Sequence, residues 1–164
     1  MPLLQSFPAL TGRAPRALIL GSMPGAASLS AGQYYAHPQN RFWPLMGTLI
    51  GAGPNLAYGQ RCKRLVDAGI ALWDVLASCE REGSLDSAIR DDTAQANDFG
   101  LLFARHPTIR TVLFNGGKAE ASFHRFVAPT LAGGAIGARA YQRLPSTSPA
   151  NASQSPAFKL AAWR

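Results

Sequence analysis

Residues 16–25 read RALILGSMPG, a short apolar run that stops abruptly at a loop of glycine, serine and proline. An apolar run of this length beside breaker residues predicts a buried strand that opens into a tight loop. Two later apolar runs are also strand candidates: IALWDV at residues 70–75, and TVLFNGG at residues 111–117, which again ends in a glycine loop. A fourth strand is expected over residues 139–144. These four runs form the framework from which the rest of the fold is predicted.

Apolar residues at helical spacing fill the intervals between the expected strands. Helices are predicted behind a cap at Asn40, from Cys62 to a stop at Gly69, behind a cap at Asn97, over residues 118–126, and behind a cap at Ser155. Strands that alternate with helices favour a parallel sheet covered on both faces. We therefore predict a single domain over residues 1–164 with a three-layer α/β/α fold and a central, mainly parallel four-stranded sheet.

Three predicted loops follow directly after a strand, at residues 21–40, 115–118 and 145–153, and all three are rich in small and polar residues and free of carboxylates. Open parallel sheets bind ligands at the carboxyl ends of their strands. A binding site is therefore expected where these loops meet. The glycine- and alanine-rich stretch 131–138 is expected to be only a turn between two elements.

The charge of the chain is unevenly distributed along its 164 residues. Sixteen Lys and Arg against nine Asp and Glu give a net charge of +7, and all nine acids lie between Asp67 and Glu120. Both ends of the chain are thus wholly cationic, which favours a polyanionic partner such as nucleic acid. We expect one DNA-facing surface that holds four arginines from the two ends, Arg13, Arg41, Arg139 and Arg143.

Several other classes of protein lose support from the sequence. Cys62 and Cys79 are too few for a disulfide framework or a four-ligand zinc site, so no metal is expected. The loop at 21–25 matches neither the phosphate-binding loop of nucleoside triphosphatases nor the dinucleotide fingerprint, so no nucleotide cofactor is expected. No apolar run approaches a membrane span, and the first residues lack the features of a signal peptide. A cytoplasmic protein without membrane contact is therefore expected.

The segment QYYAHPQNRFW, residues 33–43, gathers aromatic, amide and basic side chains between a strand and a helix. Such a mixture suits stacking on a base while its polar edge is hydrogen-bonded. Phe42 and Trp43 begin the apolar face of the next helix and are interpreted as core residues. Tyr35 and Asn40 stand outside that face and are interpreted as functional, whereas His37 is expected to be a hydrogen-bonding partner within the loop.

The chain resembles the uracil-DNA glycosylase superfamily in four segments, which occur in the order of that superfamily: GSMPG at 21–25, YYAHPQNRFW at 34–43, FNG at 114–116 and LPS at 144–146. The first two look most like its hypoxanthine-DNA glycosylase family. Mismatch-specific uracil-DNA glycosylases are nearly as similar in the same two segments. The resemblance covers residues 16–160 and implies a uracil-DNA glycosylase-like fold.

Two departures from the superfamily pattern bear on the substrate. Met23 stands where many members place Asn or Asp to hold the attacking water, and Leu144 stands where uracil enzymes carry a histidine. Both departures argue against a fast uracil enzyme and fit the hypoxanthine family. That resemblance assigns the catalytic role to Asn40 and recognition of the base to Asn115.

The resemblance implies a monofunctional glycosylase without a cofactor that acts on double-stranded DNA containing a deaminated base, and we expect a monomer. Asn40 is the predicted catalytic residue. The residues predicted to bind the base are Tyr35, Asn115, Ser22, Met23 and Gly25. The residues predicted to bind DNA are Arg143, Ser146, Thr147, Ser148 and Lys118.

Three other functions stay open from the sequence: a mismatch-specific uracil-DNA glycosylase, a catalytically weak DNA-binding member of the superfamily, and a hydrolase of free nucleosides. The ranking of hypoxanthine against uracil, xanthine and ethenocytosine is open too, as is the residue of 145–153 that enters the duplex. Chemistry with two carboxylates is excluded unless Asp74 reaches into the site. Lys118 is interpreted as a phosphate contact or a solvated residue rather than a Schiff-base nucleophile.

Overall fold

The central sheet of the fold has the four strands that the sequence predicts. The computed structural model describes residues 2–131, 139–151 and 154–164. Its strands β2 (Ala17–Gly21), β3 (Ile70–Asp74), β6 (Thr111–Asn115) and β7 (Ala140–Leu144) lie in the order β3-β2-β6-β7, and all neighbours are parallel. The predicted four-stranded parallel sheet is therefore confirmed: β2, β3 and β6 are largely buried, and β7 is the more exposed edge strand.

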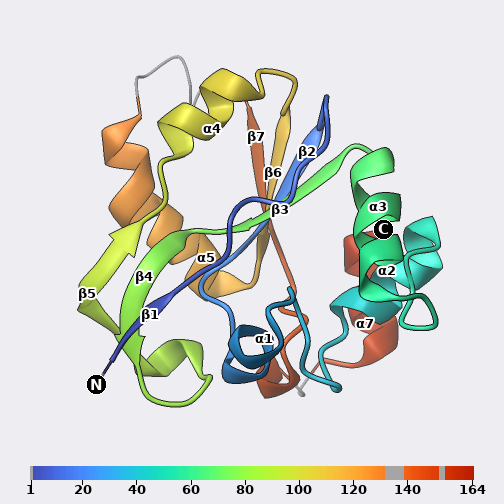
Figure 1. The fold of residues 1–164 in the computed structure, drawn as a ribbon, viewed down its shortest axis with the longest axis horizontal. Helices are drawn as coiled ribbons and strands as arrows, with labels where there is room; N and C mark the ends of the chain where they lie inside the picture. Colours follow the sequence, from blue (N-terminus) through green and yellow to red (C-terminus); the bar gives the residue numbers. More distant parts are fainter. Residues whose placement is uncertain (1, 132–138, 152–153) are drawn as a thin grey trace.

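Helices cover both faces of this sheet (Figure 1). On one face lie α2 (Phe42–Ile50), α3 (Tyr58–Asp67) and α7 (Pro156–Trp163). The other face carries α4 (Phe99–Arg105) and α5 (Gly117–Ser122), the latter continuing into a single π turn at Phe123–Val127. Short elements in the connections are α1 (Ala26–Ala31) and the 3-10 turns Asp86–Ala88, Ala128–Thr130 and Pro149–Asn151.

Two apolar cores lie on opposite faces of the central sheet because side chains of a strand alternate between its faces. Leu18 and Leu20 of β2 point into one core, with Phe99 and Phe123 among the helical residues packed there. The residue between them, Ile19, points into the other core, where α2, α3 and α7 pack. This alternation fixes the register of β2. Gly21, which follows Leu20, is therefore held at a defined position at the carboxyl edge of the sheet.

A second sheet, which the sequence analysis did not predict, lies beside α4 and α5 (Figure 1). It contains β1 (Leu3–Gln5), β4 (Leu76–Arg81) and β5 (Ile89–Ala96) in the antiparallel order β1-β4-β5. Strand β5 reads IRDDTAQA and has no apolar alternation, because much of it faces solvent. The connection between β4 and β5 matters for function, since it reaches the carboxyl end of the central sheet.

Two predicted helix caps need correction. Helix α4 is capped by Asp98, whose carboxylate accepts the Leu101 N–H at 3.0 Å, while Asn97 instead donates to the Asp74 carbonyl oxygen at 2.7 Å. Helix α2 begins after Arg41, one residue later than predicted. The predicted cap at Ser155 is confirmed, since its hydroxyl accepts the Phe158 N–H.

Two expectations depend partly on undescribed residues. Of the turn expected at 131–138, positions 132–138 lie outside the described residues, as do positions 152–153 of the loop 145–153. Within the described ranges, no helix is long and apolar enough to cross a membrane.

Candidate active site

A cavity of about 640 Å³ opens at the carboxyl ends of all four parallel strands. This is the edge of the sheet at which the sequence predicts a ligand, and the volume lies within the range of small-molecule sites. All predicted site residues except Lys118 line the cavity: Ser22, Met23, Gly25, Tyr35, Asn40, Asn115, Arg143, Ser146, Thr147 and Ser148. The structure thus brings these residues together, and their chemical roles stay predictions.

Tyr35 forms one side of the cavity in a strained backbone conformation. Its φ of 55° is the only positive φ among the described residues other than glycine. Such a conformation costs on the order of 1–3 kcal/mol and is concentrated at functional sites. One face of the Tyr35 ring stacks on Phe42, with centroids 4.2 Å apart and planes at 24°. The ring is therefore fixed in orientation where it lines the cavity, and its role in stacking on a base stays a prediction.

Asn40 is held by a local turn at the start of α2. Its Oδ1 accepts the Phe42 N–H at 2.9 Å, and its backbone N–H donates to the His37 carbonyl oxygen at 2.9 Å. The amide oxygen keeps a second lone pair for a ligand. His37 Nδ1 accepts the Gln39 N–H at 3.1 Å, so the ring has the local hydrogen bond expected from the sequence.

Asn115, at the end of β6, is bonded to the loop after β7 through both ends of its amide. Its Oδ1 accepts the Thr147 N–H at 2.9 Å, and its Nδ2 donates to Thr147 Oγ1 at 3.0 Å. Thr147 is fully buried. The backbone N–H and hydroxyl of Thr147 are thus engaged with Asn115 inside the protein, and its role as a DNA contact stays a prediction. The pair fixes the loop against the sheet.

The loop that follows β7 presents two hydroxyl groups at the cavity. Ser146 Oγ accepts the Ser148 N–H at 3.1 Å, and Ser148 Oγ accepts the Ala150 N–H at 3.2 Å. In both bonds the hydroxyl oxygen is the acceptor, so each O–H can still donate to an anion. Arg143 borders the same region with 61% of its side chain exposed, although it also pairs with Glu120 at 3.6 Å.

Lys159, which has no role predicted from the sequence, contacts this loop. The side chain of Lys159 is 3% exposed, and its ammonium donates to the Ser148 carbonyl oxygen at 3.5 Å. Burial and the nearby Arg41 lower the pKa of Lys159. The only signal in the sequence for this burial is the position of Lys159 within α7. A lysine at such a position is ordinarily interpreted as solvated, so its burial could not be predicted.

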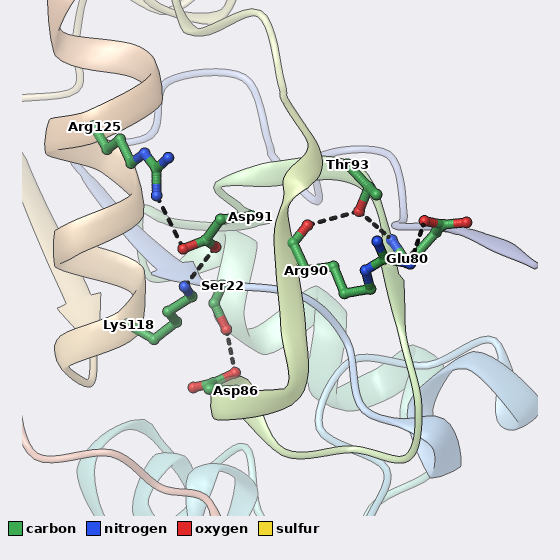
Figure 2. Close-up of polar contacts among 8 residues, drawn as sticks. All are labelled: Ser22, Glu80, Asp86, Arg90, Asp91, Thr93, Lys118 and Arg125. Atoms are coloured by element: carbon green, nitrogen blue, oxygen red, sulfur yellow. Dashed lines mark hydrogen bonds and ion pairs between the residues drawn. The ribbon is translucent and has the colours of Figure 1, made fainter. Parts of the chain in front are cut away.

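Two carboxylates, also unassigned from sequence, stand in the cavity wall. Asp74 ends β3, lines the cavity and is 4% exposed. Asp86, from the connection between β4 and β5, lines it as well and accepts the Ser22 hydroxyl at 2.6 Å (Figure 2). Burial first, and the Asp86 charge second, raise the pKa of Asp74 to about 7, against an opposing effect of Arg81. The acidic middle segment of the chain therefore supplies two carboxylates to the cavity lining.

Lys118 lies outside the cavity and has an acidic partner. Its ammonium pairs with Asp91 Oδ1 at 2.7 Å, and Arg125 pairs with Oδ2 of the same residue at 3.0 Å (Figure 2). Strand β5 thus supplies Lys118 with an intramolecular counter-ion that could not be foreseen from the sequence, and the role of Lys118 as a DNA contact stays a prediction.

The expected grouping of four arginines on one surface is wrong. Arg41 and Arg143 lie at the carboxyl edge of the sheet, where the Arg41 N–H donates to the Thr147 carbonyl oxygen at 2.9 Å. Arg139 precedes β7 and packs over the Phe103 ring at 4.0 Å, and Arg13 precedes β2. Because the strands are parallel, residues that precede them lie at the edge opposite the cavity.

We expect Asp74→Asn to stabilise the fold, by an amount that grows with pH. In the unfolded chain the carboxyl has its ordinary pKa of about 3.9, whereas the folded pKa is about 7. Between these values the unfolded state loses a proton that the native state keeps, so native stability falls as pH rises and levels off above about 7. Melting temperatures of both proteins from pH 4 to pH 8 should differ by several degrees at pH 8 and little at pH 4. A difference independent of pH contradicts this.

Comparisons with known proteins agree with the geometry. The model of the uracil DNA glycosylase superfamily matches residues 8–164. The chain is similar to the hypoxanthine DNA glycosylase of Methanosarcina barkeri, with 40% identity over 70% of this chain and 72% of the relative, and to that of Methanosarcina acetivorans, with 42% identity over the same shares. A solution NMR structure from M. acetivorans, provisionally described as a uracil DNA glycosylase, has 35% identity, covers 99% of this chain and 98% of that one, and gives a TM-score of 0.78. The resemblance drawn from the sequence is confirmed.

Proposed function

Because the chain belongs to the hypoxanthine-DNA glycosylase family of the uracil-DNA glycosylase superfamily, we propose that it flips hypoxanthine out of duplex DNA and hydrolyses its N-glycosidic bond. The products are free hypoxanthine and an abasic site for base excision repair. The observation that carries this proposal is the convergence of Tyr35 and Asn40 on one cavity beside the hydroxyl groups of Ser146 and Ser148. A stacking ring, a water-binding amide and anion donors are the parts that such a reaction needs.

The proposed reaction breaks the C1′–N9 bond and forms a C1′–O bond to water. The sugar passes through an oxocarbenium-like state, so the enzyme has to place water on C1′ and stabilise the departing base. The second lone pair of Asn40 Oδ1 accepts a hydrogen bond from this water. One water proton finally resides on the released hypoxanthine and leaves it neutral, while the hydroxyl group stays on the abasic sugar. Tyr35 covers one face of the flipped base.

Contacts to the DNA backbone are assigned to the loop after β7. Ser146 and Ser148 donate their hydroxyl protons to phosphates, and Arg143 adds a positive charge at the cavity rim. One cavity holds one flipped base, and the chain is therefore proposed to act as a monomer. A monofunctional reaction is favoured because the Lys118 amine is paired with Asp91 outside the cavity.

The test of the proposed function is abasic-site formation on a duplex with a single deoxyinosine. We expect strand breaks after alkali treatment and none before it, since a monofunctional enzyme leaves the backbone intact. Matched duplexes with uracil, xanthine or ethenocytosine give the substrate ranking. Stable binding of the deoxyinosine duplex without any release of base would instead support a DNA-binding protein that lacks activity.

Salt dependence tests whether the substrate is DNA rather than a free nucleoside. Duplex affinity should fall steeply with salt, because bound phosphates release counterions. Arg143→Ala should weaken binding of all duplexes alike and reduce the slope of log affinity against log salt by about 1. Arg13→Ala at the opposite edge is the matched control and should leave the slope unchanged. Equal slopes for the two variants would remove Arg143 from the DNA contact.

Met23 is proposed to set the preference against uracil. Its side chain is 6% exposed, lines the cavity and packs into the core on the side of α4 and α5. Met23→Asn should create or raise activity on uracil in a G·U duplex, because an amide there can hold water for a small pyrimidine. Met23→Leu keeps the apolar volume and should show no such gain. A folded Met23→Asn protein that removes hypoxanthine without any gain on uracil would mean that the loop contributes backbone geometry only.

A further inference from the structure

Two buried oxygens of the cavity lining, the Tyr35 hydroxyl oxygen and Asp74 Oδ2, have no hydrogen-bond partner among the described residues, and only the second is a carboxylate oxygen. Asp74 Oδ2 is shielded from solvent and has no hydrogen bond to any described residue. Buried polar atoms of native proteins are nearly always hydrogen-bonded, and an unpaired carboxylate oxygen is costly. Because this atom belongs to a residue of the cavity lining, a ligand that donates a hydrogen bond would remove the cost.

Asn115, to which the family resemblance assigned recognition of the base, is less available to a ligand than Asp74. Both ends of the Asn115 amide are bonded to Thr147, in a buried pair that holds the loop. Asp74 ends the strand on the other side of β2, in register with Gly21. It therefore faces the cavity from the opposite side to Asn115.

We propose that Asp74 is a specificity-determining residue whose Oδ2 accepts a hydrogen bond from the N1–H group of hypoxanthine. This deepens the proposed function and rests on it. Deamination of adenine converts its N1 from a bare acceptor into a donor, so hypoxanthine presents N1–H where adenine presents a lone pair. A carboxylate accepts a hydrogen bond from the N1–H group of hypoxanthine and repels the N1 lone pair of adenine. Asp74 thereby admits a deaminated purine and rejects its parent.

The surroundings of Asp74 make this discrimination dependent on pH. The Asp86 carboxylate, the Arg81 guanidinium and the phenol groups of Tyr34 and Tyr35 face Asp74 from the elements packed around it. With its pKa at about 7, the carboxyl is ionised at pH 8 and largely protonated at pH 6. The protonated form can donate to an acceptor, so selectivity for the N1–H group should increase across this interval.

The experiment compares deoxyinosine with 1-methyldeoxyinosine, each placed in the same duplex. The methylated nucleoside has the same N9 glycosidic bond but carries a methyl group in place of the N1 hydrogen. Asp74→Leu removes the acceptor and keeps the bulk, and it should slow single-turnover release of hypoxanthine at pH 8 by about twentyfold. Its preference for deoxyinosine over the methylated base should fall by a similar factor. Asp74→Asn retains an acceptor oxygen and should slow release less than Asp74→Leu does, and it should lose the change in preference between pH 6 and pH 8. The exposed Asp92→Asn is the matched control.

Failure of this inference differs from failure of the proposed function. A parent protein that releases no hypoxanthine contradicts the proposed function, and the contact is then measured as affinity for a duplex with a 2′-fluorinated deoxyinosine that resists hydrolysis. If Asp74→Leu slows both substrates, or weakens both complexes, by the same factor, Asp74 is only structural and the inference is overturned. Parental behaviour of Asp74→Leu also overturns it.

Discussion

We expect Asn40→Ala to lower the single-turnover rate of hypoxanthine release by about a hundredfold to a thousandfold, the usual loss when one preorganised polar group is removed from a transition state. The amide orients the attacking water and touches no phosphate in the proposed reaction. Affinity for the deoxyinosine duplex should therefore stay within a few-fold of the parent. The measurement is base release at saturating enzyme, with duplex binding determined in parallel.

Folding has to be controlled in this experiment, because Asn40 Oδ1 also accepts the Phe42 N–H at the start of α2. Loss of such a bond costs about 1 kcal/mol, which lowers the melting temperature without unfolding the protein. Asn40→Asp keeps an acceptor oxygen and should preserve that bond. Asn55→Ala removes an exposed amide away from the cavity lining and should leave the rate unchanged. A parental rate in folded Asn40→Ala would end the catalytic assignment.

Three strands of the central sheet, β2, β3 and β6, could be predicted because they are short apolar runs and are largely buried. The edge strand β7 reads AYQRL and is mostly exposed, so its signal in the sequence is weaker. Strands β4 and β5 escape the same reasoning because part of their surface is solvated and β5 carries charged residues. With the second sheet unforeseen, the position of the β4–β5 connection at the cavity could not be inferred.

The site could be predicted where a residue follows a parallel strand, and less well where its chemistry depends on a neighbour. The sequence placed Asn115 and the serine loop at one edge, as found. It could not show that Thr147 is buried against Asn115, because that contact joins the ends of two strands. Nor did it assign the ionic partner of Lys118, which comes from β5.

Charge along the chain was a poor guide to charge in space. The segment that contains all the acids supplies both a wall of the cavity, through Asp74 and Asp86, and the partner of Lys118. The cationic ends divide between the two edges of the sheet, since Arg139 precedes β7 and Arg143 lies within it. The direction of each strand therefore determines which basic residues can reach DNA.

Gly21→Ala should reduce hypoxanthine release by about a hundredfold through the geometry of the pocket alone. A Cβ atom at Gly21 would stand 2.5 Å from Asp74 Oδ1 and 3.3 Å from the Tyr35 hydroxyl oxygen. The first distance is too short for any side chain, so the Asp74 carboxyl must shift, and misplacement of about 1 Å can cost this much in rate. Gly21 does not have a positive φ, so an alanine there causes no backbone strain.

The matched control for this variant adds the same methyl group where space is open. Gly59 lies in α3, and a Cβ atom added there would meet no neighbouring group within 4 Å. Gly59→Ala should therefore keep the parental rate, and it should stabilise the helix by about 0.5–1 kcal/mol. Because Gly21 contributes no side chain, any loss in Gly21→Ala comes from the groups that the methyl displaces. A double variant, Gly21→Ala with Asp74→Asn, separates the steric effect from the effect of charge. It keeps the clash with the side chain at position 74 but removes the carboxylate charge. A Gly21→Ala protein with parental rates and selectivity would show that the Asp74 carboxyl and the Tyr35 hydroxyl need no fixed position, which contradicts the pocket proposed here.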